Sequence, residues 1–204
     1  MKQGLTEIIM IVDKSGSMQA KLTDTIGAFN AFLDKQKKEP GEAKVTLTLF
    51  DTTYNLAYNG VPLADVQPFN MNNYVPAGMT ALLDAMGKTI DEVGARLDKT
   101  SEAERPEKII VVILTDGEEN SSVEYKHEQV MQKVEHQKAA YNWEFVFLGA
   151  SKVALDHARG LGVTNCVAYQ NTGAGTMNAM SYVSDAVASY RATGNTHLPP
   201  DAQA

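Results

Sequence analysis

Residues 8–18, which read IIMIVDKSGSM, place an apolar run directly before an acid and two serines that flank a glycine. A short apolar run followed by glycine and small polar residues is typical of a buried parallel strand that turns tightly into a helix. Asp13, Ser15 and Ser17 then lie close together, because the glycine allows a sharp turn. Carboxylate and hydroxyl oxygens suit a hard cation such as Mg²⁺ or Mn²⁺ better than zinc. The stretch therefore predicts a cation site at the end of a buried strand.

The remainder of the chain alternates between strand-like and helix-like patterns. The segments VTLTLF and YNLAY predict an antiparallel hairpin that ends at the turn Asn59-Gly60, and the six-residue apolar run 109–114 predicts another buried strand. Apolar spacings of three and four predict helices over these ranges: 18–38, 80–97, 123–139, 152–160 and 175–192. We therefore expect a three-layer α/β sandwich with a doubly wound, mostly parallel sheet and one antiparallel edge strand.

Length and charge limit the domain count and the classes of partner. A chain of 204 residues fits one domain, expected over residues 1–193, followed by a frayed tail over residues 194–204. The net charge of −7 favours a protein or a cation as partner over nucleic acid or an anionic membrane. The N-terminus shows no secretory signal, and the single cysteine, Cys166, is expected to be a buried thiol, so we expect a cytoplasmic protein.

Two further segments are expected at the same edge of the sheet as Asp13. Asp116 closely follows the buried strand 109–114, and right-handed crossovers make this strand a neighbour of the first. Thr80 lies beside Gly78 at the start of a predicted helix. Ligands of open α/β sheets bind beyond the carboxyl ends of the strands, where the strand order reverses. All three segments are therefore expected to face one crevice.

Three ordered motifs carry a family resemblance: DKSGS at 13–17, GMTAL at 78–82 and TDG at 115–117. They resemble the metal-ion-dependent adhesion site of von Willebrand factor A domains, and the resemblance extends over about residues 5–192. It implies a metal site made by the five residues that fill the motif: Asp13, Ser15, Ser17, Thr80 and Asp116. The chain resembles a stand-alone prokaryotic or phage-type member of that family.

The resemblance also implies how such a site works. The hydroxyls of the two serines and of Thr80 would bind Mg²⁺, or Mn²⁺ or Ca²⁺ in its place, while the two aspartates act directly or through water. The open coordination position would accept an Asp or Glu carboxylate from a partner protein, an exchange that Mg²⁺ tolerates because it keeps water ligands. In the family, ligand binding moves the last helix, here residues 175–192.

Some residues have alternative interpretations. Without the other motifs, the serines and Asp13 would be a polar turn that caps a helix. Glu118 and Glu119 follow the third motif and would strengthen cation binding, weaken acidic ligands or point away. Asp51 ends another strand and is better explained as a hairpin-turn acid. The four histidines show no metal-ligand spacing and are expected at the surface or on helices.

Three functions from different classes fit the sequence. The first is a non-enzymatic, metal-dependent protein-binding module. The second is a metal-dependent phosphoryl-transfer enzyme of the haloacid-dehalogenase type, which also has an aspartate after its first strand. That chemistry needs a second acid two residues later, where this chain has Ser15. The third is a structural subunit of a larger assembly, in which the metal only braces the fold.

Overall fold

A computed structural model describes residues 1–196, so most of the predicted frayed tail, residues 197–204, lies outside the described part. Six strands are described: β1 (Lys2–Asp13), β2 (Ala43–Phe50), β3 (Tyr54–Pro62), β4 (Pro106–Thr115), β5 (Glu144–Gly149) and β6 (Asn165–Ala168). Five α-helices accompany them: α1 (Leu22–Gln36), α2 (Leu82–Lys99), α3 (His127–Tyr141), α4 (Lys152–Gly160) and α5 (Gly173–Thr193). Three 3₁₀ helices complete the described elements: η1 (Gly16–Lys21), η2 (Leu63–Asp65) and η3 (Glu102–Glu104).

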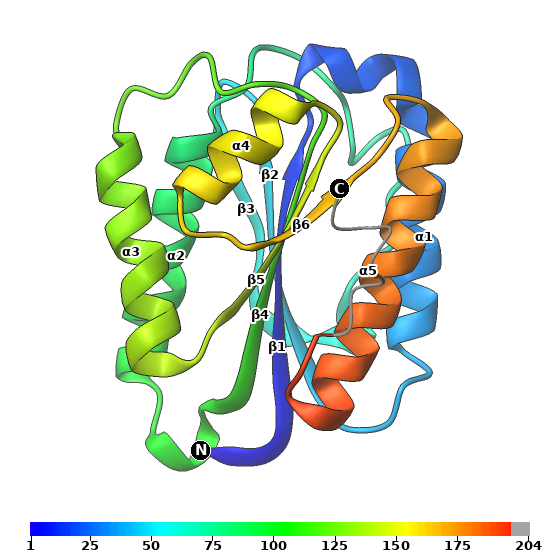
Figure 1. Cartoon of the computed structure of the whole chain (residues 1–204). Coiled ribbons are helices and arrows are strands. Elements are labelled where there is room, and N and C mark those ends of the chain that lie inside the picture. The colour runs from blue at the N-terminus through cyan, green and yellow to red at the C-terminus, as the bar shows by residue number, and fades with distance from the viewer. Residues whose placement is uncertain (197–204) are drawn as a thin grey trace.

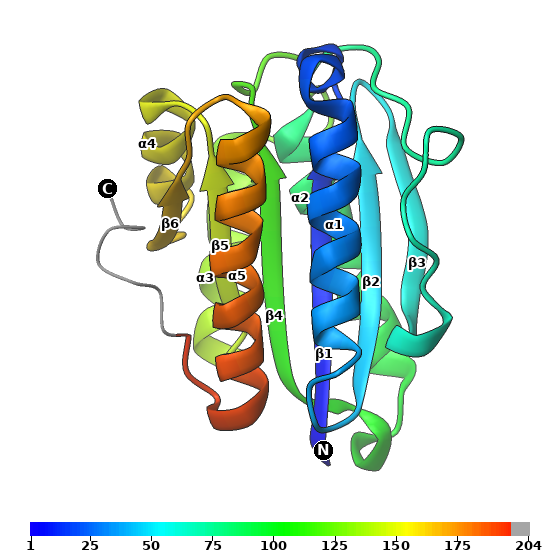
Figure 2. The ribbon, with the colours of Figure 1, turned by 90° about the vertical axis from the view of Figure 1, so that its right-hand side faces the viewer.

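The strands form one sheet in the order β3-β2-β1-β4-β5-β6, with β3 antiparallel and the others parallel. Helices α1 and α5 cover one face, and α2, α3 and α4 cover the other (Figure 1). The view onto the first face shows α1 and α5 side by side across the sheet (Figure 2). The expected three-layer α/β sandwich with one antiparallel edge strand is therefore confirmed.

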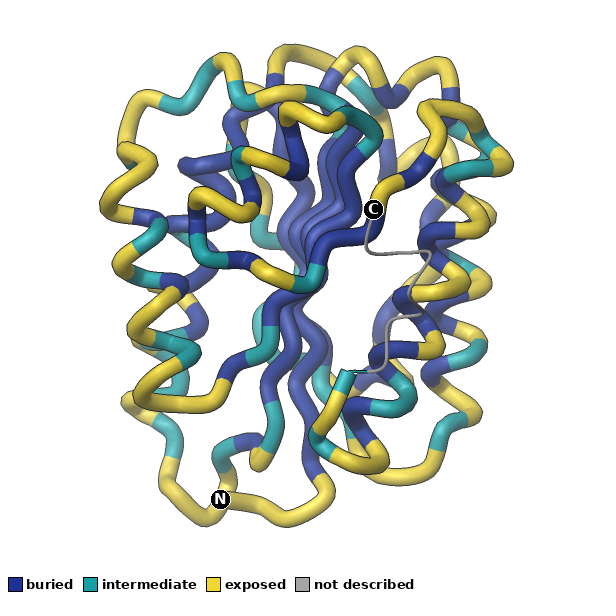
Figure 3. The backbone as a smooth tube through the Cα atoms, viewed as in Figure 1, coloured by how far each residue is buried: buried dark blue, intermediate teal, exposed yellow. Residues whose placement is uncertain are grey.

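The two faces of the sheet carry separate hydrophobic cores, because successive side chains of a strand point to opposite faces. In β1, Ile8 and Met10 belong to the core beneath α1 and α5, while Ile9 and Ile11 belong to the core beneath α2, α3 and α4. Figure 3 shows the central strands buried over most of their length and the helices buried on their inner sides, whereas the residues of the edge strand β3 are intermediate or exposed. The central strand is thus apolar at each of the five positions 8–12 before Asp13, as parallel strands covered on both faces require.

Local differences from the predicted elements have physical causes. The turn predicted at Asn59-Gly60 is wrong, since both residues lie inside β3, where Gly60 has a φ of +72° and the pairing with β2 changes register. Such a bulge accommodates an extra residue without ending the strand. The first predicted helix starts as η1 before α1 begins at Leu22. The third starts at His127, because Asp84 binds the backbone N–H groups of residues 123–125.

Within residues 1–196, none of the helices has the length and apolar composition that crossing a bilayer would require. The predicted buried thiol of Cys166 is confirmed, with 2% of the residue exposed.

The order of the strands in the sheet reverses between β1 and β4. The connection after β1 leads to α1 on one face of the sheet, and the connection after β4 leads to α3 on the other face. This is the position at which open α/β sheets bind ligands, and the three motifs meet there.

Candidate metal centre

Backbone hydrogen bonds join the first two motif segments beyond the carboxyl end of β1. Gly16 N–H donates to Gly78 O over 3.1 Å, and Ala77 N–H donates to Lys14 O over 2.8 Å. A Cβ added to Gly16 would lie 3.3 Å from Gly78 O, so a larger residue would press on the second segment. The glycine that the sequence places between the two serines thus permits both the turn and this close approach.

Four of the five predicted ligands lie in one connected cluster. Ser15 Oγ lies 3.0 Å from Ser17 Oγ, and Ser17 Oγ donates to Asp116 Oδ1 over 2.6 Å. Asp13 Oδ1 accepts the backbone N–H of Ser15 over 2.6 Å, and its Oδ2 accepts the Thr115 hydroxyl over 2.6 Å. Since β1 and β4 are paired neighbours, Asp13 at the end of β1 and Asp116 just after β4 share one edge, as expected.

Thr80 borders the same cluster from the second motif. A Cβ built on Gly117 would lie 3.0 Å from Thr80 Oγ1 and 3.8 Å from Ser17 Oγ, so both hydroxyls face the space beside this glycine. The backbone of Thr80 is fixed by Asn120, whose Oδ1 accepts Thr80 N–H over 2.9 Å and whose N–H donates to Thr80 O over 3.1 Å. Among the described residues, the Thr80 hydroxyl has no hydrogen-bond partner.

Asp13 is a fully buried carboxylate whose hydrogen-bond donors are all neutral. None of the ion pairs found among residues 1–196 involves Asp13. Burial raises the pKa of Asp13 to about 6, although the hydrogen bonds from Thr115 and Ser15 act in the opposite direction. A buried carboxylate without a cationic partner is costly, so the position favours a nearby positive charge.

The negative field of the two acids extends to neighbouring tyrosines. Tyr74 OH donates to Asp13 O over 2.6 Å, and Tyr169 OH donates to Thr115 O over 3.1 Å. Burial first, and then the charges of Asp13 and Asp116, raise the pKa values of both phenols far above their ordinary value. Both tyrosines are therefore neutral hydrogen-bond donors that hold the backbone at the ends of β1 and β4.

Lys21 is a buried cation that sequence reasoning missed. Its ammonium group binds Asp116 Oδ2 and Asn171 Oδ1, and only 4% of the residue is exposed. Nothing in the local sequence marks this lysine, because its partners lie 95 and 150 residues away along the chain. Asp116 therefore presents one oxygen to Ser17 and the other to Lys21.

The two glutamates after the third motif have different surroundings. Glu119 accepts the backbone N–H of Leu83 over 2.8 Å, and so caps the start of α2, where the helix dipole favours a negative charge. Its other oxygen accepts the N–H groups of Ser121 and Ser122. Glu118 is exposed. Of the alternatives for Glu119, the structure thus favours a carboxylate that is turned away from the cluster.

Asp51 lies near the cluster but is already paired. It forms an ion pair with Lys14 and accepts the N–H and hydroxyl of Thr53 over 2.6 and 2.7 Å, as a hairpin-turn acid does. As expected, His127 and His136 lie on a helix, α3, and His157 lies on α4, while His197 lies outside the described residues. The rings of His127 and His157 stack with centroids 5.1 Å apart. No group of three or more His, Cys, Asp and Glu residues within 1–196 is arranged to hold a metal ion.

The donor set at this edge fits a hard divalent cation. Three hydroxyls and two carboxylates converge from loops after β1 and β4 and from the segment before α2. Mg²⁺ and Mn²⁺ are bound by such oxygen ligands together with water, whereas zinc prefers nitrogen and sulfur ligands. Because the three hydroxyls carry no charge, only the two carboxylates would offset the charge of a cation held here.

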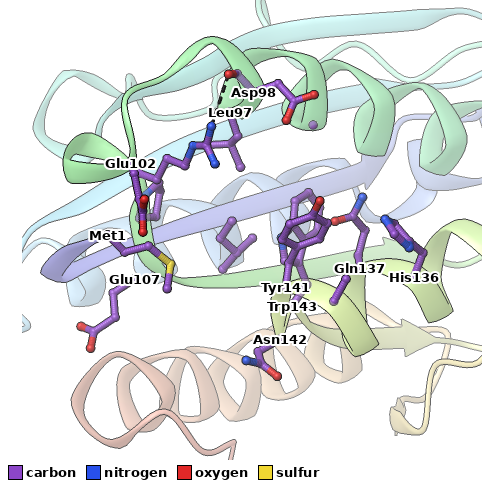
Figure 4. Close-up of a pocket in the computed structure, with 15 residues that line it drawn as sticks. Met1, Leu97, Asp98, Glu102, Glu107, His136, Gln137, Tyr141, Asn142 and Trp143 are labelled. Carbon is purple, nitrogen blue, oxygen red and sulfur yellow. Dashed lines mark hydrogen bonds between the residues drawn. The ribbon is translucent and has the colours of Figure 1, made fainter.

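A separate concave region lies at the opposite end of the sheet, between the C-terminal turns of α2 and α3 (Figure 4). Its volume is about 370 Å³. Buried Ile109 and Trp143 contribute apolar surface, and exposed Asp98 and Glu102 contribute negative charge. It shares no residue with the candidate metal centre, and it lies at the amino ends of the parallel strands rather than at their carboxyl ends.

Among protein families, the model of the von Willebrand factor type A domain matches residues 7–180 of the chain. All five predicted ligands lie inside this range. Comparison of the sequence with curated proteins gives no match.

Solved structures share the fold at low sequence identity. A von Willebrand factor type A protein from Catenulispora acidiphila has a TM-score of 0.60 and 15% identity, over 88% of this chain and 42% of that chain. Proximal thread matrix protein 1 from the mussel byssus has a TM-score of 0.60 and 15% identity, over 89% and 45%. Manganese-loaded Plasmodium vivax TRAP protein has a TM-score of 0.58 and 16% identity, over 87% and 73%. The chain thus spans less than half the length of the first two.

Proposed function

The chain belongs to the von Willebrand factor type A family, and from this premise we propose that it is a non-enzymatic, metal-dependent protein-binding module. The hydroxyls of Ser15, Ser17 and Thr80 would hold Mg²⁺, or Mn²⁺ or Ca²⁺ in its place. Asp13 and Asp116 would contribute directly or through water. When bound, the ion supplies a coordination position whose water exchanges for an Asp or Glu carboxylate of a partner protein.

The observation that carries this proposal is the burial of the Asp13 carboxylate without a cationic partner. A fully buried carboxylate with only neutral donors lies beside three hydroxyls at the ligand-binding edge of the sheet. A polar turn that merely caps a helix does not explain this arrangement, because neither Ser15 nor Lys21, the residues before η1 and α1, makes a side-chain cap. The manganese-loaded state of the similar Plasmodium vivax protein is consistent with a divalent cation here.

The chemistry of the cluster also favours binding over phosphoryl transfer. A haloacid-dehalogenase-type reaction needs an acid two residues after the nucleophilic aspartate, but Ser15 occupies that position. Ser15 uses its N–H to bind Asp13 and its hydroxyl to contact Ser17. A cytoplasmic location and movement of α5 on ligand binding are further predictions.

Affinity capture from a lysate of the source cell or its host tests the proposal. The protein is immobilised with Mg²⁺, with chelator, and as the variants Asp13→Ala and Thr80→Val, and Asp98→Ala at the opposite edge is the matched control. We expect a partner that is retained by the wild type and by Asp98→Ala only when Mg²⁺ is present. Equal retention under all conditions, or phosphatase turnover that Asp13→Asn abolishes, would contradict the proposal.

A further inference from the structure

Lys21 connects three segments that are distant in sequence. It ends η1, the 3₁₀ helix that also contains Ser17, and its ammonium binds Asp116 after β4 and Asn171 in the loop between β6 and α5. The Asp116 side chain is 1% exposed and the Lys21 side chain 4% exposed, so this pair is shielded from water. A shielded charge acts on its surroundings more strongly than a surface charge, because solvent and salt screen it less.

The other charges near the cluster are compensated, bound elsewhere or, for Glu118, exposed to solvent, which screens them. Lys14 and Asp51 neutralise each other in an ion pair, and the carboxylate of Glu119 is bound to the start of α2. The fixed charges of the centre itself are therefore those of Asp13, Asp116 and Lys21. Together they amount to one negative charge when both acids are ionised.

This sum determines how many acidic ligands the loaded site can accept. A divalent cation changes the charge of the centre from one negative to one positive, and a single incoming carboxylate then makes it neutral. Without Lys21, the cation alone would neutralise the centre, and an incoming carboxylate would leave a net negative charge in a buried place. Burying an uncompensated charge is unfavourable.

Resting on the metal-binding function proposed above, we propose that Lys21 is a specificity-determining residue that makes the loaded site selective for anionic ligands. The positive charge of the lysine repels the divalent cation and so weakens its binding. The same charge leaves the loaded centre with one net positive charge, which attracts one carboxylate. It is a positioning and electrostatic residue rather than a metal ligand, since an ammonium group has no lone pair to donate. Removing its charge must therefore shift cation affinity and carboxylate affinity in opposite directions.

The test compares the wild type with Lys21→Gln, which removes the charge but keeps a hydrogen-bonding group near Asp116 and Asn171. Lys21→Met is a second variant, and Lys35→Gln on α1 is the matched control because Lys35 pairs with Asp185 away from the site. Mn²⁺ affinity is measured by calorimetry. Displacement of water from bound Mn²⁺ by acetate is measured by water proton relaxation, and circular dichroism confirms the fold of each variant.

We expect both Lys21 variants to bind Mn²⁺ about tenfold more tightly, since one unit charge at short range exceeds this effect at an effective dielectric constant of about 20. We expect acetate to displace water from their Mn²⁺ only at concentrations about tenfold higher. Lys35→Gln should match the wild type in both measurements. A purely structural lysine would not produce these opposite shifts.

The outcomes separate the two proposals. If the wild type binds Mn²⁺ and a folded Lys21 variant binds Mn²⁺ equally or more weakly, the role of Lys21 is overturned while the metal-binding function stands. If only the Lys21 variants bind Mn²⁺, the electrostatic role is supported and the proposed function of the wild-type centre fails. If no folded protein binds Mn²⁺, both are overturned.

Discussion

Asp84 is expected to hold the loop that follows Asp116, and its substitution by asparagine tests this directly. The residue is 7% exposed and lies in the first turn of α2. Its Oδ1 accepts the N–H groups of Glu124 and Tyr125 over 2.9 and 2.7 Å, and its Oδ2 accepts Val123 N–H over 2.9 Å. One carboxylate thus fixes three consecutive backbone groups of the loop that also contains Asn120, the partner of Thr80.

The expected cost of Asp84→Asn follows from these contacts. Asparagine retains one acceptor oxygen, so at most two of the three N–H groups stay bonded, while the third faces an NH₂ group. Loss of a hydrogen bond to a charged acceptor costs about 1.5–3 kcal/mol, and the remaining bonds weaken when the charge is removed. We therefore expect a loss of about 3 kcal/mol in the free energy of unfolding, which corresponds to a fall in Tm of about 6–12 °C for a domain of this size.

Thermal unfolding and amide hydrogen exchange measure this effect. We expect the lower Tm together with faster exchange of the amides of residues 123–125, because these lose their acceptor. Asp98→Asn is the matched control on the same helix, since Asp98 is exposed, and its Tm should stay within about 1 °C of the wild type. An Asp84→Asn protein with an unchanged Tm and unchanged exchange in the loop would refute the reasoning.

Other substitutions test packing, hydrogen bonding and pH dependence. Gly87→Ala should destabilise the fold by about 1–3 kcal/mol in urea unfolding, because the new Cβ would lie 2.3 Å from the Tyr125 ring. Gly94→Ala is the matched control on the same helix, because its new Cβ would have no heavy atom within 4 Å. It should stabilise the fold by about 0.5–1 kcal/mol. Tyr74→Phe leaves a buried carbonyl without its donor and should cost about 1–3 kcal/mol in the same assay, so an unchanged urea midpoint would contradict that role. Burial would raise the pKa of Asp51, but hydrogen bonds from Lys14 and Thr53 outweigh it and lower that pKa. The resulting stability is present above about pH 4 and is lost as pH falls below that value, so Asp51→Asn should flatten the acid limb of a pH–stability curve.

The fold was predictable because its signals are local and periodic. The apolar run before Asp13 and the run 109–114 both identified buried parallel strands, and the alternation in VTLTLF identified the antiparallel edge. The predicted ends of helices were less accurate where distant residues decide them. The third helix starts late because Asp84, about forty residues earlier, binds the backbone before it. At Gly60, the same sequence signal fits a turn or a bulge, and only the partner strand distinguishes them.

The candidate site was predictable to the extent that its residues occur in motifs. Topology brings Asp13, Ser15, Ser17 and Asp116 together, since the two strands that precede the acids are neighbours. The supporting residues, such as Lys21, lie in segments without any motif. The role of Lys21 depends on contacts across 95 and 150 positions, and no local pattern encodes such a contact.

The account depends on whether three distant segments hold one divalent cation, and calorimetric titration of the wild type and Thr80→Val with Mg²⁺ and Mn²⁺ tests this most directly. Thr80→Val keeps the side-chain shape and removes a hydroxyl that has no partner among the described residues, so the fold should be unaffected. We expect one-to-one binding by the wild type and loss of measurable binding by Thr80→Val with an unchanged Tm in chelator. Absence of binding by the wild type, or equal affinity of the two proteins, would contradict the account.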